Sequence, residues 1–159
     1  MDSSLLNQYG GPVILVVEDH RAVRQALREL LLVAFGAIEV LEAANVGEAL
    51  QQVMAHNVDI VLMDIRLPGV DGVTGARQVL EHSSHSGVVM VSNLDDIVHR
   101  RAAARAGAKA FVSKRAIGKE LIPAIEGLLA ARNDEPFSHG GHDRIVEGSR
   151  HGAAAPFAM

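Results

Sequence analysis

Cysteine is absent from the sequence and aromatic residues are scarce, and both features limit what the protein can be. Without cysteine the chain has no disulfides, no zinc–thiolate sites and no cysteine nucleophile. Aromatic residues make up 3% of the chain and apolar residues 48%, so the core must be built from aliphatic side chains. The length of 159 residues is sufficient for one domain with a substantial core.

A long apolar segment and a strong excess of one charge are also missing. The longest mostly apolar run, residues 30–38, is far shorter than the ~20 residues that a membrane-spanning helix needs. The N-terminus lacks the basic region and apolar stretch of a signal peptide. A net charge of −4 gives no general attraction to a nucleic-acid backbone. We therefore expect a cytoplasmic protein with neither a membrane nor a nucleic-acid partner.

Short apolar segments alternate with segments of helical periodicity. The run at 13–17 is continuously apolar, and the run at 58–64 is apolar apart from Asp59 and its closing Asp64, as in central parallel strands that are buried on both faces. Five strands alternating with five helices predict a doubly wound α/β fold with a parallel sheet. Strands are expected at 13–17, 38–43, 58–64, 87–92 and 108–113, the second of them at an edge, and helices at 21–35, 46–54, 73–81, 95–106 and 117–131.

The ends of the chain differ in composition from the periodic region. We expect an N-terminal arm at residues 1–11, one domain at 12–132, and a C-terminal tail at 133–159. The tail is rich in Gly, His and Ala and lacks amphipathic periodicity, so it has too little apolar material for a second domain. An output domain is therefore not expected.

Polar side chains suited to one kind of site follow four of the five expected strands. Glu18 and Asp19 follow the first strand, Asp64 and Ser92 are the last residues of the third and fourth, and Lys114 follows the fifth. If the first and third strands are neighbours, the three carboxylates converge at the edge where such sheets bind ligands. Carboxylates held that close favour a bound cation or raised pKa values, and oxygen ligands suit Mg²⁺. A divalent ion beside a lysine would stabilise a phosphoryl group.

Each of these residues also has a structural explanation when it is taken alone. Asp19 could cap a helix, Ser92 could be a turn residue, and Lys114 could be an ordinary surface lysine. Their conjunction at the ends of neighbouring strands favours the shared phosphoryl–metal site.

Four motifs resemble the receiver domains of response regulators, the CheY-like family, over about residues 12–131. The strongest resemblance is DIRLPGVDG, in which an Asp at a strand end is followed by Pro, Asp and Gly. The resemblance implies a flavodoxin-like (βα)5 fold with strand order 2-1-3-4-5, and a role in bacterial two-component signalling. The motifs are VILVVED (13–19), VLMDIRLPGVDG (61–72), VMVSN (89–93) and AFVSK (110–114).

The resemblance also implies roles for the residues at the strand ends. Asp64 would be the phosphoacceptor, taking a phosphoryl group from a histidine kinase or a histidine phosphotransfer protein. Lys114 would pair with the phosphoryl oxygens. The Mg²⁺ ligands would be Glu18, Asp19, Asp64 and the backbone carbonyl of Arg66.

Two further positions correspond to the switch of the family. Ser92 would be the switch hydroxyl, and Phe111 the aromatic residue that moves inward when this hydroxyl is drawn to the phosphoryl group. The surface formed by helix 95–106, strand 108–113 and helix 117–131 is the usual partner or dimer face. The resemblance thus allows a homodimer through this face, and the tail 133–159, which holds a few apolar residues, is a candidate arm on the neighbouring subunit.

One departure from the family follows the lysine, where proline is common and often forms a cis bond. Arg115 stands here instead, and a cis bond before a non-proline residue costs about 3–4 kcal/mol. A trans bond would place Lys114 differently unless the site offsets that cost.

The leading functional hypothesis is a phosphorylated signalling switch, not an enzyme that acts on a separate substrate. The alternative is a pseudo-receiver, a constitutive protein-interaction module that works without phosphorylation. A haloacid-dehalogenase-type hydrolase is disfavoured, because Arg66 stands where such enzymes usually carry a second Asp and the chain lacks a large cap domain.

Overall fold

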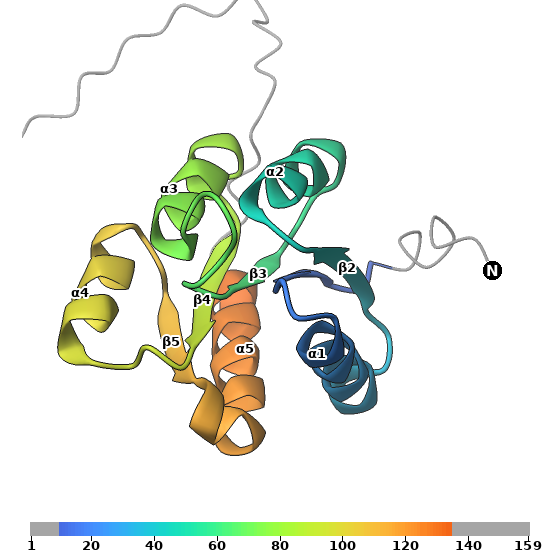
Figure 1. The fold of residues 1–159 in the computed structure, drawn as a ribbon. Coiled ribbons are helices and arrows are strands. Elements are labelled where there is room, and N and C mark those ends of the chain that lie inside the picture. Colours follow the sequence, from blue (N-terminus) through green and yellow to red (C-terminus); the bar gives the residue numbers. More distant parts are fainter. Residues whose placement is uncertain (1–9, 135–159) are drawn as a thin grey trace, which may run out of the picture.

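The computed structural model describes residues 10–134, which form a parallel sheet covered by helices on both faces (Figure 1). The strand order is β2-β1-β3-β4-β5, and every neighbouring pair is parallel. The predicted fold and strand order are confirmed, including the position of the second strand at an edge. The strands are β1 (Val13–Val17), β2 (Glu39–Ala43), β3 (Ile60–Met63), β4 (Gly87–Ser92) and β5 (Ala110–Ser113).

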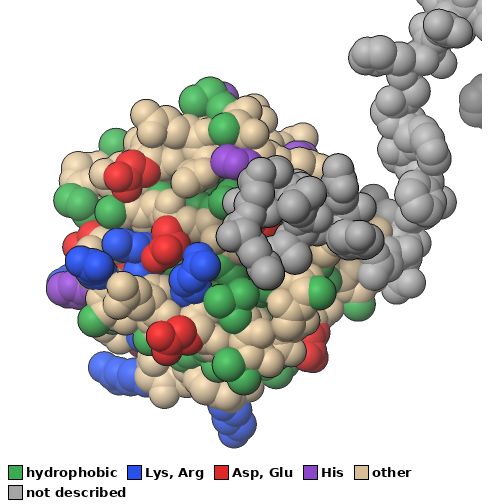
Figure 2. All heavy atoms as spheres, turned by 90° about the vertical axis from the view of Figure 1, so that its right-hand side faces the viewer, with side chains coloured by type: hydrophobic (Ala, Val, Ile, Leu, Met, Phe, Trp, Pro, Cys, Tyr) green, Lys and Arg blue, Asp and Glu red, His purple; other side chains and the backbone are tan. Residues whose placement is uncertain are grey.

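The helices divide between the two faces of the sheet. Helices α1 (Arg21–Phe35) and α5 (Ile117–Asp134) cover one face, and a 3-10 turn, η2 (Lys114–Ala116), leads from β5 into α5. Helices α2 (Val46–Ala55), α3 (Gly72–His82) and α4 (Ile97–Arg105) cover the other face. On the side of the molecule formed by α1, β2 and α2, side chains of both charges lie next to one another (Figure 2).

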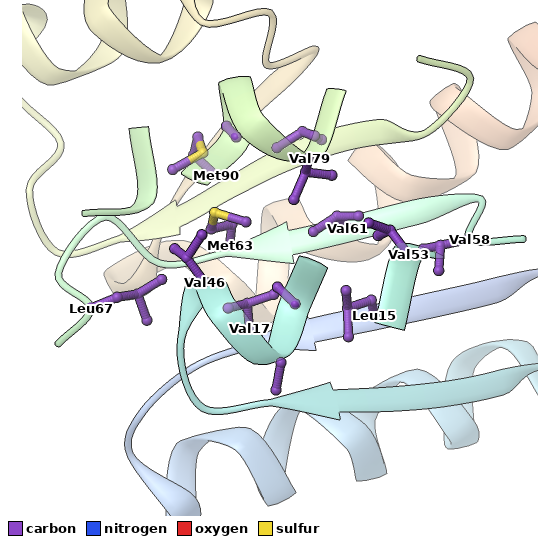
Figure 3. Packing of buried hydrophobic residues seen from close by; sticks show 14 of the residues in the cluster. Leu15, Val17, Val46, Val53, Val58, Val61, Met63, Leu67, Val79 and Met90 are labelled. Carbon is purple, nitrogen blue, oxygen red and sulfur yellow. The ribbon is translucent and has the colours of Figure 1, made fainter. Parts of the chain in front are cut away.

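The apolar runs of the strands are continuous because both faces of the sheet are covered. No residue of β1 is more than 2% exposed, and its side chains alternate between two core clusters. Leu15 and Val17 join the cluster beneath α2 and α3 (Figure 3), while Ile14 and Val16 face α1 and α5. Burying each such aliphatic side chain contributes roughly 1.5–3 kcal/mol, so the sheet core is the main source of stability.

All five expected helices are present with bounds within three residues of those predicted, and α1 and α5 show the clearest differences from the sequence pattern. In α1 the apolar residues Ala26, Leu27, Leu31 and Ala34 recur at helical spacing, but only the two leucines are buried and the two alanines are exposed. The longer leucine side chains join the core cluster between α1 and the sheet, whereas the short alanine side chains remain exposed. Helix α5 extends to Asp134, beyond the predicted 131, and accommodates Pro123 on its exposed side.

The N-terminal caps follow the sequence closely. The side chain of Asn45 accepts a hydrogen bond from the Glu48 amide at 2.9 Å, and the Glu48 carboxylate accepts one from the Ala44 amide at 2.6 Å. Asn45 and Glu48 therefore form a capping box at the start of α2, with the Glu reaching one residue further back than usual. Asp96 caps α4 in the same way.

Asp71 caps α3, and its removal should cost about 1 kcal/mol of unfolding free energy. Its carboxylate accepts hydrogen bonds from the amides of Val73 at 2.9 Å and Thr74 at 3.0 Å, and the bond from Thr74 is the main reason why its pKa is lowered below 3.8. A lowered pKa means that the stabilisation is complete above pH 3.8 and is lost as the pH falls further. Urea unfolding of Asp71→Ala should therefore show the deficit at neutral pH and little of it in strong acid; equal deficits at both would contradict this account.

The predicted arm and tail lie mostly outside the described residues, so their expected roles stay predictions. Within residues 10–134, no helix combines the length and apolar character needed to cross a membrane.

Candidate functional site

The carboxyl ends of β1 and β3 bring three carboxylates together. Because these two strands are neighbours, Glu18 and Asp19 after β1 meet Asp64 after β3. One oxygen from each of the three carboxylates lies within 4.8 Å of the others. The convergence expected from the sequence is therefore present.

Lys114 joins this group from the end of β5. Its Nζ donates hydrogen bonds to Glu18 Oε2 and to Asp64 Oδ2, each at 2.8 Å. Among residues 10–134 there are no cis peptide bonds, so the bond before Arg115 is trans. With this trans bond Lys114 still contacts both carboxylates, and η2 begins at the lysine, with the Ser113 hydroxyl accepting from the Arg115 amide at 3.3 Å.

Burial and proximity set the charges of the site. Glu18 is 2% exposed and Asp64 6%. Burial raises the pKa of Glu18, the hydrogen bond from Lys114 opposes this, and the negative charge of Asp64 raises it further. Burial disfavours the charge of Lys114, but its bonds to Asp64 and Glu18 prevail and raise its pKa above 10.5, so the ammonium form persists. Asp19 is exposed and forms the open side of the site.

The loop after β3 closes tightly behind Asp64. The Asp64 amide donates to Val17 O at 3.1 Å, and the Gly72 amide donates to Ile65 O at 2.7 Å. A Cβ at position 72 would lie 1.7 Å from the Asp64 carbonyl oxygen, so only glycine permits this approach. The glycine that ends the DIRLPGVDG motif therefore has a steric reason in the fold.

Arg66 contributes to the site through its backbone. Its amide donates to Asp64 Oδ1 at 3.2 Å, and its side chain is exposed. The predicted use of its carbonyl as a metal ligand stays a prediction.

The two predicted switch residues lie on adjacent strands. Ser92 is 1% exposed at the end of β4, and its Oγ accepts a hydrogen bond from the Leu94 amide at 3.1 Å. Phe111, on β5, is half-buried, and the guanidinium carbon of Arg100 lies 4.6 Å from the centre of its ring. The basic side of α4 is therefore partly used within the domain, by a cation–π contact that the sequence did not reveal.

The residues present fit a hard divalent cation. All three side chains offer carboxylate oxygens, the ligand type that Mg²⁺ prefers. When all are ionised, three carboxylates and one ammonium leave two net negative charges, which a divalent ion would neutralise.

Known proteins share both the sequence pattern and the fold. The family model described as "Response regulator receiver domain" matches residues 14–126. The DNA-binding transcriptional activator EvgA of Escherichia coli is 36% identical over 126 residues, which cover 78% of this chain and 60% of EvgA. A two-component response regulator of the LuxR family from Aurantimonas superposes with a TM-score of 0.72 at 31% identity, over 77% of this chain and 87% of that one.

A third relative is the response regulator protein TrrA of Thermotoga maritima, whose structure was solved in complex with Mg(2+)-BeF. It is 28% identical with a TM-score of 0.65, over 74% of this chain and 98% of that one. The chain belongs to the response regulator receiver domain family, whose members act in two-component signalling.

The chain spans between 55% and 67% of the length of the curated relatives that it matches. EvgA is by its name a DNA-binding protein, which conflicts with the expectation that nucleic acid plays no part. That expectation rested on the net charge of −4, which describes the average of the chain and does not exclude such a partner.

Proposed function

We propose that Asp64 accepts a phosphoryl group from a histidine kinase or a histidine phosphotransfer protein in a reaction that requires Mg²⁺. The observation that carries the proposal is the position of the Asp64 carboxylate. One of its oxygens accepts the Lys114 hydrogen bond at 2.8 Å, and the carboxylate lies within the cluster that contains Glu18 and Asp19. A relative solved with Mg(2+)-BeF supports the same chemistry.

In the transfer step, a carboxylate oxygen of Asp64 attacks the phosphorus of a phosphohistidine. The new P–O bond forms as the P–N bond breaks, and the imidazole nitrogen leaves with the bonding electrons and takes a proton. Lys114 stays charged and would turn its ammonium from the Asp64 oxygen to a phosphoryl oxygen. Glu18, Asp19, Asp64 and the Arg66 carbonyl would hold the metal. Mg²⁺, when bound, supplies positive charge beside the transferring phosphoryl oxygens.

The response to phosphorylation would pass through Ser92 and Phe111. The Ser92 hydroxyl keeps its proton free to donate to a phosphoryl oxygen, because its Oγ acts as the acceptor towards Leu94. Phe111 would then move inward and leave Arg100, changing the surface formed by α4, β5 and α5. This surface, with the C-terminal tail, would bind a partner or a second copy of the chain.

The metal requirement is tested by weighing the intact protein after incubation with Mg²⁺ and phosphoramidate. We expect a single phosphoryl adduct, no adduct when Mg²⁺ is removed with a chelator, and much slower formation in Asp19→Asn. Asp19 is exposed, so this substitution removes a ligand without opening the core. Glu29→Gln, an exposed carboxylate on α1, is the matched control and should react like the wild type.

A wild-type protein that gains no adduct, and that beryllofluoride with Mg²⁺ leaves unchanged, would contradict the proposal. The pseudo-receiver would then be the better account of the function, and partners should bind without a phosphodonor.

A further inference from the structure

Arg24, in the first turn of α1, reaches back to the corner between β1 and α1. Its Nη1 donates a hydrogen bond to the backbone carbonyl of Glu18 at 2.8 Å, and its Nε donates to Glu42 Oε1 on β2 at 3.2 Å. Its side chain is 18% exposed, and both contacts are partly buried. Arg24 therefore links Glu18, the neighbour of Asp19, to the edge strand β2.

The same corner has few other fixed contacts. The Glu18 amide donates to Ala43 O on β2 at 3.0 Å, which holds one side of this peptide. His20, the N-cap of α1, has no side-chain capping bond, and its amide makes a bond of 3.2 Å to Glu18 Oε1. The carbonyl of Glu18 is held by Arg24. The carbonyl side of the Glu18–Asp19 peptide is thus held by one guanidinium group, while β2 holds the Glu18 amide and Lys114 its carboxylate.

We infer that Arg24 is a positioning residue that fixes the Glu18–Asp19 corner and so sets the affinity of the site for a divalent cation. The inference rests on the proposed function for the existence of the metal site. It concerns a residue outside the ligand set, acting on the backbone of one ligand. Residues that orient metal ligands in this indirect way typically change metal affinity by about tenfold or more when they are replaced.

In Arg24→Met, the loss of the charge and the loss of the backbone contact should change the affinity for a divalent cation in opposite directions. Removing a positive charge near three carboxylates should by itself tighten cation binding, because it removes a repulsion. Losing the fixed corner should weaken binding, because the free carboxylates must then be ordered as the ion binds. A net weakening in Arg24→Met would therefore identify positioning as the dominant effect.

Arg28 provides a closely matched control one helical turn later. It carries the same charge on the same helix, and its Nη1 also donates to a backbone carbonyl, that of Val40 on β2, at 3.1 Å. It lies 3.7 Å from the same Glu42 carboxylate. Arg28→Met thus removes an equal charge and a similar contact without touching the Glu18 carbonyl.

The test is the dissociation constant of Mg²⁺, measured by isothermal titration calorimetry on the full chain. We expect it to be about tenfold higher in Arg24→Met, unchanged or slightly lower in Arg28→Met, and partly restored in Arg24→Lys, whose ammonium can still donate to the carbonyl. Unfolding in urea shows that each variant is folded under the conditions of titration. A constant for Arg24→Met within twofold of the wild type, or an equal rise in Arg28→Met, would overturn the inference.

Hydrogen exchange separates a failure of this inference from a failure of the proposed function. If the wild type bound no Mg²⁺, the metal proposal would fall. Positioning by Arg24 would then be judged by exchange at the amides of Glu18, Asp19 and His20. Faster exchange at these amides in Arg24→Met, absent in Arg28→Met, supports the inference, and unchanged exchange overturns it.

Discussion

Asp64→Asn should abolish the phosphoryl adduct and at the same time make the metal-free protein more stable. The adduct is lost because an amide oxygen cannot form the acyl phosphate. Stability rises because the site buries Asp64 and Glu18 side by side with a single ammonium to balance both. Removing one buried charge should increase the unfolding free energy at neutral pH by about 1 kcal/mol.

The pH dependence of this gain has a definite sign. The pKa of Glu18 is raised in the folded protein, chiefly by burial, so between the unfolded value of 4.5 and the folded value the native state binds the proton more tightly. The stability of the wild type therefore falls as the pH rises through this window. In Asp64→Asn the pKa of Glu18 moves back towards 4.5, so the difference from the wild type should grow as the pH rises above 4.5. Urea titrations across this range measure it, and an Asn variant less stable than the wild type at neutral pH would contradict the account.

Lys114→Met should lower the rate of phosphorylation and the stability of the fold, and should raise the affinity for Mg²⁺. Phosphorylation by phosphoramidate should slow by about two to three orders of magnitude, the loss typical for a group that stabilises developing negative charge. The folded protein should lose about 3 kcal/mol, because Glu18 and Asp64 keep their burial without a counter-charge. Mg²⁺ should bind more tightly than in the wild type, because a positive charge beside the ligands has gone.

The raised pKa of Lys114 makes its contribution nearly independent of pH in the physiological range. The stabilisation is complete below pH 10.5 and is lost only as the pH rises through the higher folded value. Stopped reactions analysed by mass, urea unfolding and calorimetry give the three quantities. Lys109→Met, an exposed lysine next to β5, is the control and should leave all three unchanged. A Lys114→Met protein that reacts at the wild-type rate would show that the lysine has only a structural role.

The features that follow from local chemistry could be predicted closely from the sequence. The bounds of β1 match because a β-branched run buried on both faces has one plausible structure, and Asn45 caps α2 because its side chain competes for the amides of the first turn. The convergence of Asp19 and Asp64 required one further assumption, that β1 and β3 are neighbours, and the family resemblance supplied the strand order.

The features that depend on long-range geometry were not predictable in this way. No spacing rule connects Arg24 with Glu42, or Arg100 with Phe111, because each pair meets only after the sheet has formed. Likewise, Arg115 raised doubt about the position of Lys114 in the sequence, and the contacts of Lys114 with Glu18 and Asp64 appear only in the folded structure.

The central claim is that Asp64 itself receives the phosphoryl group, and chemical trapping tests it most directly. Protein phosphorylated in the presence of Mg²⁺ is reduced with borohydride, which converts an aspartyl phosphate to homoserine, and is then mapped by peptide mass spectrometry. We predict homoserine at position 64 and at no other acidic residue, with Glu18 and Asp19 intact. Homoserine at position 19 or elsewhere, or a phosphorylated protein in which residue 64 remains aspartate, would contradict the account.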